Sequence, residues 1–128
     1  MKKIILASLL MMSVSAAFAQ TNDGIACDGT GTASAAVVTG ATDNTRYIRS
    51  TFKPVCSNNS HVVYTDDLTN QKLFAGSASV KGSGYFGGST LGGAIQRAGD
   101  CPAKACGSVA GTQAEAGRTA ANAYGAST

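Results

Sequence analysis

The sequence predicts a mainly β fold, with a small α+β fold as the alternative, built on a compact β-hairpin or sheet core that disulfides cross-link. Three observations lead to this prediction. One is a strong hairpin pattern over residues 61–80, and the second is an even number of cysteines. The third is a C-terminal segment rich in Ala, Gly, Ser and Thr, which predicts a short helix or disorder. The 128 residues are enough for one small domain.

The first nineteen residues match a secretory signal peptide of the bacterial type. Lys2 and Lys3 form a positive start, residues 4–18 are apolar or small, and Ala17-Phe18-Ala19 precedes Gln20 as a cleavage pattern. An apolar run of about 15 residues is shorter than the roughly 20 that span a bilayer, so we expect cleavage and no membrane span afterwards. The expected location is periplasmic or extracellular. The chain then divides into residues 1–19 (signal peptide), 20–106 (β-rich disulfide-containing domain) and 107–128 (small-residue-rich segment).

Small residues dominate the chain after the leader. Ala, Gly, Ser and Thr make up 57 of the remaining 109 residues, whereas Leu, Ile, Val and Phe supply 16. Such a chain buries little apolar surface, so cross-links or a partner are expected to stabilise it. The formal charge of +3 falls to +1 without the two leader lysines, which does not supply the dense basic stripe of a nucleic-acid-binding protein.

The cysteines predict two structural disulfides. Cys27, Cys56, Cys101 and Cys106 all lie after the leader, and an even number in an exported chain allows three connectivities. Of these we favour Cys27–Cys56 and Cys101–Cys106. The spacings lack the C-x2-C pairs of zinc sites and redox motifs, so no metal and no cofactor is expected.

The hairpin is the clearest element in the sequence. Residues 61–65 are mostly β-branched or aromatic, 66–70 supply a turn, and 72–80 read as the return strand. One face of that strand would hold Phe74, Gly76, Ala78 and Val80, and the other would hold Leu73, Ala75, Ser77 and Ser79. The other expected elements are an irregular segment over 20–32, a short strand over 33–39, a turn over 42–44, a half-buried strand over 45–53, a glycine-rich loop or broken strand over 81–93 and a helical turn over 94–98. At the C-terminus, a capping box over 112–115 and a stop at Gly125 favour a helix over 113–123, and disorder is the alternative.

Three patterns resemble functional motifs, but each has a simpler structural explanation. Residues 82–87 match G-x-G-x-x-G, yet no clear helix and no acidic residue about 20 positions later follow, so a glycine-rich turn is favoured over nucleotide binding. His61 is the only histidine, and no G-x-S-x-G elbow accompanies it, so we expect no catalytic site and no enzyme. Arg46 and Arg49 would point to opposite faces of a strand, so the basic and aromatic residues around them predict no nucleic-acid surface.

The function expected from these features is that of an exported structural or surface-interaction protein, with a filament or coat subunit as the specific form. Its partner is then another copy of the chain or another envelope or extracellular protein. The alternative is a monomeric periplasmic binding or inhibitor module that acts through the Gly82–Gly93 loop. Ser83-Gly84-Tyr85 is similar to the Ser-Gly-x-Tyr loop of small periplasmic lysozyme inhibitors, but it lacks the intervening position. That resemblance implies that Ser83 and Tyr85 enter a partner's cleft, and with Phe86 they form the candidate binding set.

Overall fold

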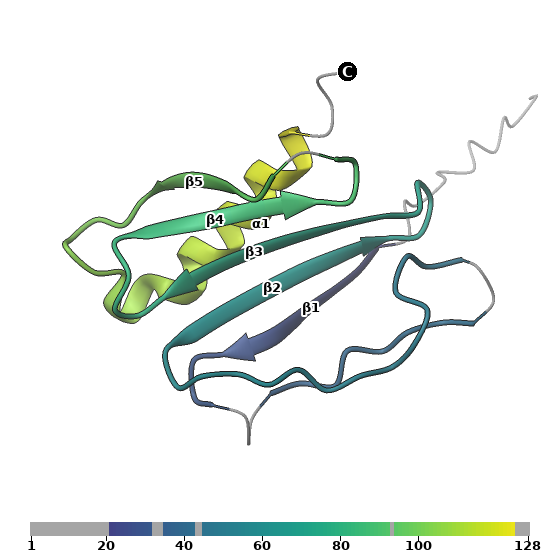
Figure 1. Ribbon diagram of the computed structural model, residues 1–128, viewed down its shortest axis with the longest axis horizontal. Coiled ribbons are helices and arrows are strands. Elements are labelled where there is room, and N and C mark those ends of the chain that lie inside the picture. Colours follow the sequence, from purple (N-terminus) through teal and green to yellow (C-terminus); the bar gives the residue numbers. More distant parts are fainter. Residues whose placement is uncertain (1–20, 32–34, 43–44, 93, 125–128) are drawn as a thin grey trace, which may run out of the picture.

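In the part of the chain that the structure describes, five antiparallel strands follow one another in sequence order across one sheet, and a helix covers one face (Figure 1). The structure is a computed structural model that describes residues 21–31, 35–42, 45–92 and 94–124. The mainly β prediction is confirmed, and so is the helical alternative for the C-terminal segment. The elements are β1 (Thr21–Asp28), β2 (Ser60–Asp67), β3 (Lys72–Ser79), β4 (Gly84–Ser89), β5 (Gln96–Asp100), the 3-10 turn η2 (Gly107–Val109) and α1 (Ala110–Tyr124).

The hairpin predicted over residues 61–80 forms as β2 and β3, with Asp67 opposite Lys72 at the turn. The Asp67 carboxylate closes this turn by accepting hydrogen bonds from the backbone N–H groups of Thr69 and Asn70 and from Asn70 Nδ2. Desolvation raises the pKa of Asp67, but these hydrogen bonds outweigh it and hold the pKa below its usual value. The ionised carboxylate therefore stabilises the reversal.

The N-terminal stretch expected to be irregular over residues 20–32 contains β1, so that prediction is wrong for most of its length. Its polar residues and Gly24 hide the strand pattern in the sequence. Pairing with β2 makes the segment extended, and the register shifts between Ile25 and Cys27. Gly24 lies against the ring of Tyr64, where a Cβ atom would collide with the phenol.

The glycine-rich segment 81–93 contributes β4, in line with the broken-strand alternative. The helical turn predicted over 94–98 is wrong, because Gln96 and Arg97 pair with Gly87 and Phe86 of β4 and begin β5. A helix of so few residues is unstable in isolation, and the sheet offers its backbone groups regular partners.

The chain between β1 and β2 forms an irregular two-stranded excursion, residues 35–42 and 45–56, which we call the ribbon (Figure 1). Val38 and Phe52 join its two halves, since each backbone N–H donates to the other's carbonyl oxygen (2.8 and 3.0 Å). The strands predicted over 33–39 and 45–53 are wrong in the described residues, because this single bridge replaces them and neither segment joins the sheet. Phe52 is 51% exposed, and it lies on a segment that does not join the sheet. Residues 43–44 of the predicted turn lie outside the described residues.

Helix α1 follows η2 directly and packs along β3 and β4 (Figure 1). The capping box predicted over 112–115 is wrong, because Thr112 is the third residue of the helix and not its N-cap. Gly125 and the predicted signal peptide lie outside the described residues.

Glycine allows the helix to rest directly on the sheet. A Cβ atom on Gly76 of β3 would collide with the Ala114 carbonyl oxygen and the Arg118 amide nitrogen, and one on Gly117 would collide with the Phe86 carbonyl oxygen. The small-residue composition is therefore a packing requirement, because larger side chains would push α1 away from the strands. The helix side chains with no exposed surface are all alanines: Ala110, Ala114 and Ala121.

Arg118 fastens the helix to the first two strands. Its guanidinium donates to the Glu115 carboxylate one turn earlier and to Thr65 Oγ1 of β2. The Thr65 hydroxyl in turn donates to Asp23 Oδ1 of β1. The Glu115 hydrogen bond is the main cause that raises the pKa of Arg118, so its guanidinium remains charged.

Candidate functional site

The candidate site is the face of the sheet that points away from α1. Side chains alternate between faces along a strand, and in β3 the residues that pack toward the helix are buried. Phe86 of β4 pairs with Ser77 of β3 and with Arg97 of β5, so it lies on the face opposite the helix. The β3 residues on that same face are Leu73, Ala75, Ser77 and Ser79.

Phe86 stands between two hollows on this face. One hollow has a volume of about 440 Å³ and the other about 360 Å³, and Val62, Ser77 and Phe86 line both of them. The hollows exist because the neighbours of Phe86 are small: Ala75, Ser77, Ser79 and Gly88 leave the backbone close to the surface. The larger hollow is also lined by Leu73, Ala75, Gly88, Thr90 and Ile95, and the smaller one by Ser79, Ser83 and Arg97.

This surface, which we call the open face, combines apolar side chains with hydroxyl groups. Its residues are Leu73, Ala75, Ser77, Ser79, Phe86, Gly88, Ile95 and Arg97. Ile95 is 78% exposed and Phe86 is 41% exposed, although both are large apolar side chains. The charged group at its rim, Arg97, is paired with Asp100, so the open face presents mainly apolar surface.

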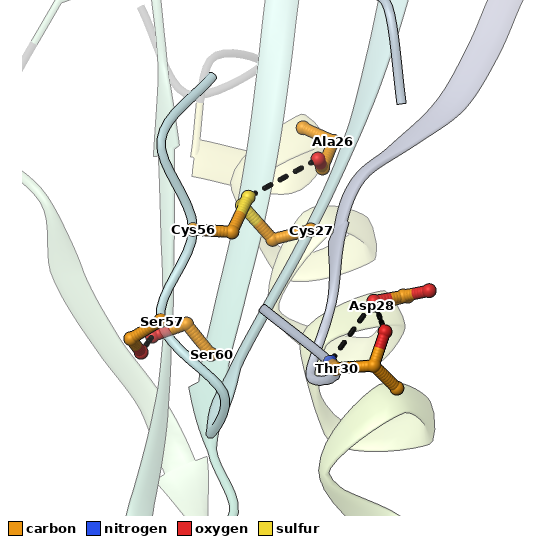
Figure 2. Close-up of a disulfide and its surroundings, with 7 residues drawn as sticks. All are labelled: Ala26, Cys27, Asp28, Thr30, Cys56, Ser57 and Ser60. Atoms are coloured by element: carbon orange, nitrogen blue, oxygen red, sulfur yellow. Dashed lines mark hydrogen bonds between the residues drawn. A yellow bond between two sulfur atoms is a disulfide. The ribbon is translucent and has the colours of Figure 1, made fainter. Parts of the chain in front are cut away.

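The ribbon covers the remaining part of the same face, over β1 and β2. At its base, Cys27 and Cys56 are bridged with their Cα atoms 5.7 Å apart, and with Ala35 and Val62 they form a small buried cluster. Figure 2 shows this bridge with Cys56 Sγ 3.4 Å from the Ala26 carbonyl oxygen. A bridged sulfur carries no proton, so this is a packing contact.

Asp66 holds the ribbon at a second point. Its side chain is fully buried, and Oδ1 and Oδ2 accept hydrogen bonds from the backbone N–H groups of Tyr47 and Ile48 (3.0 and 3.1 Å). The ribbon is therefore fixed to the sheet by a covalent anchor, the Cys27–Cys56 bridge, and by a polar anchor, Asp66.

Tyr64 lies on the same face as Asp66. Burial and the neighbouring Asp66 charge raise the pKa of Tyr64.

The structure separates the three predicted binding residues. The Tyr85 side chain packs toward α1 beside the buried cluster of Val63, Ala78 and Ala114, whereas Phe86 lies on the open face. Ser83 is exposed before β4, and its carbonyl oxygen accepts the Cys101 N–H. Phe86 and Ser83 therefore border the same hollow, and Tyr85 does not join them.

Both favoured disulfides are confirmed. Cys101 and Cys106 are bridged with their Cα atoms 4.9 Å apart, and both pack in the core under α1. All four cysteines are paired.

His61 lies at the start of β2 on the helix side of the sheet. A Cβ atom on Gly29 would collide with its ring, and one on Gly111 of α1 would meet the ring at an ordinary distance of 3.4 Å. Within the described residues, no group of three or more His, Cys, Asp or Glu is placed to hold a metal ion.

Ile95 is the functional candidate that sequence reasoning missed. An isolated isoleucine among Gly, Ala and Gln gives no strand pattern, and only the pairing of β5 with β4 brings it beside Gly88. In the sequence, the small side chains of Ala75, Ser77 and Ser79 on one predicted strand face were the available signal for this surface.

No helix in the described part of the chain has the length and apolar character needed to cross a membrane. Comparison with protein-family models, with curated proteins and with solved structures finds no match to this chain.

Proposed function

We propose that this chain is an exported bacterial structural or surface-interaction protein, and that its open face binds a second copy of the chain. The observation that carries the proposal is the hollowed apolar surface around Phe86, which lies opposite the helix. Apolar surface of this kind is stabilised when a partner removes it from water. A protein that associates in this way is a candidate subunit of a filament or coat, and we propose no catalytic role for it.

The exposed Phe86 ring between two hollows supports a second copy as the occupant. Two sheets pack face to face about 10 Å apart, with their inner side chains interdigitating. In a two-fold pair, Phe86 of each copy can enter a hollow beside Phe86 of the other, so that the same surface serves both partners. The larger hollow, at about 440 Å³, has room for a phenyl ring.

The size of the open face predicts a weak pair. Strands about 4.8 Å apart that rise about 3.4 Å per residue give β3, β4 and β5 a projected area of roughly 310 Å². A standard stable interface buries about 800 Å² of accessible surface on each partner. Association is therefore expected to depend on protein concentration, and a filament would need a further contact besides this closed pair.

The sheet edges favour a contact between faces over a contact between strands. The edge strand β5 carries Arg97 and Asp100, both well exposed, and β1 carries a register shift at its centre. Charges and bulges on edge strands hinder pairing with another chain. Among the open-face residues, Arg97 alone is charged; it lies at the rim and is paired with Asp100, which leaves the surface around Phe86 and Ile95 apolar.

Export is part of the proposal. It is based on the leader pattern of residues 1–19, and the two disulfides are compatible with an oxidising compartment such as the periplasm or the extracellular space.

The test is sedimentation velocity of the mature protein, residues 20–128, over a range of concentrations. We expect a reversible monomer–dimer equilibrium that Ile95→Asp weakens at least about tenfold, because it places a charge on the apolar surface. Val55→Asp is the matched control, since Val55 is 89% exposed but lies on the ribbon. A protein that stays monomeric at its highest soluble concentration, or equal effects of the two variants, would contradict the proposal.

The second candidate is a monomeric periplasmic binding or inhibitor module. The volume of the larger hollow lies within the range of about 300–1,000 Å³ that is typical of ligand sites, which favours this candidate. A monomeric protein that captures an envelope enzyme, and loses this capture on Phe86→Ala, would favour it over self-association. Tyr85 is left unchanged in that test because its side chain packs in the core.

A further inference from the structure

The ribbon presents large apolar side chains to solvent. Val37 is 57% exposed, Tyr47 48%, Phe52 51% and Val55 89%. These four belong to the nine large apolar residues that are exposed in the described chain, and they lie on the ribbon rather than on the open face. The ribbon therefore exposes four large apolar side chains that do not belong to the open face around Phe86.

Positive charge accompanies these side chains. Residues 45–59 contain Arg46, Arg49 and Lys53 and no Asp or Glu, which gives this segment a formal charge of +3. Because the chain after the leader has a net charge of +1, the remainder of that chain is slightly acidic. Arg49 and Lys53 are exposed, and Arg46 donates to the Thr39 carbonyl oxygen within the ribbon.

The ribbon holds these groups in place. The Cys27–Cys56 bridge fixes its base, and the buried Asp66 carboxylate fixes the backbone at Tyr47 and Ile48. Exposed apolar side chains on an anchored backbone lose little conformational freedom when they bind, which favours a binding role.

From these observations we infer that the ribbon is a docking surface for an anionic lipid bilayer. Phe52 and Val55 enter the boundary between headgroups and acyl chains, and Tyr47 lies at the headgroup level. Lys53 pairs with a lipid phosphate, and the positive charges of Arg46 and Arg49 add to the attraction of the anionic surface. The protein binds the bilayer surface from one side and does not span it.

The aliphatic residues favour a bilayer over a soluble polyanion. Nucleic acids and acidic polysaccharides can pair with the basic residues, and nucleic-acid bases can stack on Tyr47 and Phe52. Neither offers an apolar phase for Val37 and Val55. A bilayer satisfies both groups at once, because its phosphates are anionic and its acyl region is apolar.

The experiment is co-sedimentation of the disulfide-intact protein, residues 20–128, with vesicles. Vesicles of phosphatidylglycerol and phosphatidylcholine are compared with vesicles of phosphatidylcholine alone. We expect binding to the mixed vesicles, weaker binding as salt rises, and much weaker binding to the neutral ones. Val55→Asp is expected to lower the partition coefficient at least about tenfold, and Lys53→Gln about fivefold.

Ile95→Asp is the matched control, because it makes the same kind of change at a similarly exposed residue on the open face. This variant is expected to leave vesicle binding unchanged. Circular dichroism shows whether each variant remains folded. Equal binding to both kinds of vesicle, full binding by Val55→Asp, or tighter binding to heparin than to mixed vesicles would each overturn the inference. The result is independent of self-association, which the open-face variants report.

Discussion

A single buried carboxylate positions much of the ribbon. Both oxygens of Asp66 are used by backbone N–H groups, those of Tyr47 and Ile48, and the side chain has no exposed surface. A residue that cannot accept these hydrogen bonds leaves two backbone donors without their partner. An unsatisfied buried polar group typically costs about 1–3 kcal/mol.

We therefore expect Asp66→Ala to lower the free energy of unfolding by about 1–3 kcal/mol and to speed amide exchange at Tyr47 and Ile48. Urea denaturation and hydrogen exchange measure the two effects. Asp100→Ala is the control, because it breaks an ion pair whose side chains are largely exposed and should change stability by less than about 1 kcal/mol. Unchanged amide exchange in Asp66→Ala would show that Asp66 does not anchor the ribbon.

Adjacent residues in β4 have opposite roles. Tyr85 contributes to the core beneath α1, and Phe86 contributes to the open face. The sequence indicated both residues as candidates but could not separate them, because the segment that contains them is rich in glycine and has no clear strand period. The pairing of this segment as β4, between β3 and β5, decides which side chain is available to a partner.

At the level of elements, helix α1 depends on glycine for contact rather than for flexibility. Gly117 lies in the middle of the helix, where glycine is intrinsically unfavourable by about 1 kcal/mol relative to alanine. Its backbone approaches the Phe86 carbonyl oxygen so closely that a Cβ atom would collide with it. The sequence shows only the weak helix former, and the contact that requires it comes from the packing of α1 on β4.

Two alanine substitutions on this helix are therefore expected to act in opposite directions. Gly117→Ala should destabilise the protein by about 1–3 kcal/mol through overpacking against β4. Gly111→Ala should stabilise it by up to about 1 kcal/mol, since a Cβ atom there meets the His61 ring at ordinary distances of 3.4 Å or more. Thermal and urea denaturation of both variants check the pair of signs, and a stabilising effect of Gly117→Ala would refute the close contact.

Within the elements, the β2–β3 hairpin could be predicted because its turn residues and its β-branched and aromatic residues are local features of residues 61–80. β1 and β5 could not, because their own residues have no strand period and only hydrogen bonds to β2 and β4 make them extended. The alternation of residues 45–53 resembles a sheet pattern, although in the described residues the ribbon contributes only the Val38–Phe52 bridge.

At the scale of the whole molecule, the two disulfides supplement a small core. The Cys27–Cys56 bridge joins residues 29 positions apart and holds the ribbon to β1, whereas Cys101–Cys106 joins residues 5 apart beneath α1. In the chain-entropy model, a cross-link that closes a longer loop restricts the unfolded chain more strongly.

Replacing Cys27 and Cys56 together with alanine is expected to lower the free energy of unfolding by about 3.5 kcal/mol, and replacing Cys101 and Cys106 by about 2 kcal/mol. Thermal unfolding of each double variant under non-reducing conditions tests the order. A larger loss for the Cys101 and Cys106 pair would show that packing under α1, rather than loop closure, governs their contribution.

The amino-acid sequence alone determined the mainly β class and the hairpin, because these depend on local side-chain pattern and turn residues. It favoured Cys27–Cys56 and Cys101–Cys106 among three possible connectivities, and the tertiary structure selected that one. The sequence also determined that small residues would dominate the packing. Only the tertiary structure decided where those small residues pack. It placed one set of glycines and alanines between α1 and the sheet, and it left another set around Phe86 as the open face. A glycine in the sequence looks the same in either place. Only the neighbouring elements decide whether a helix covers it or it remains on the open face.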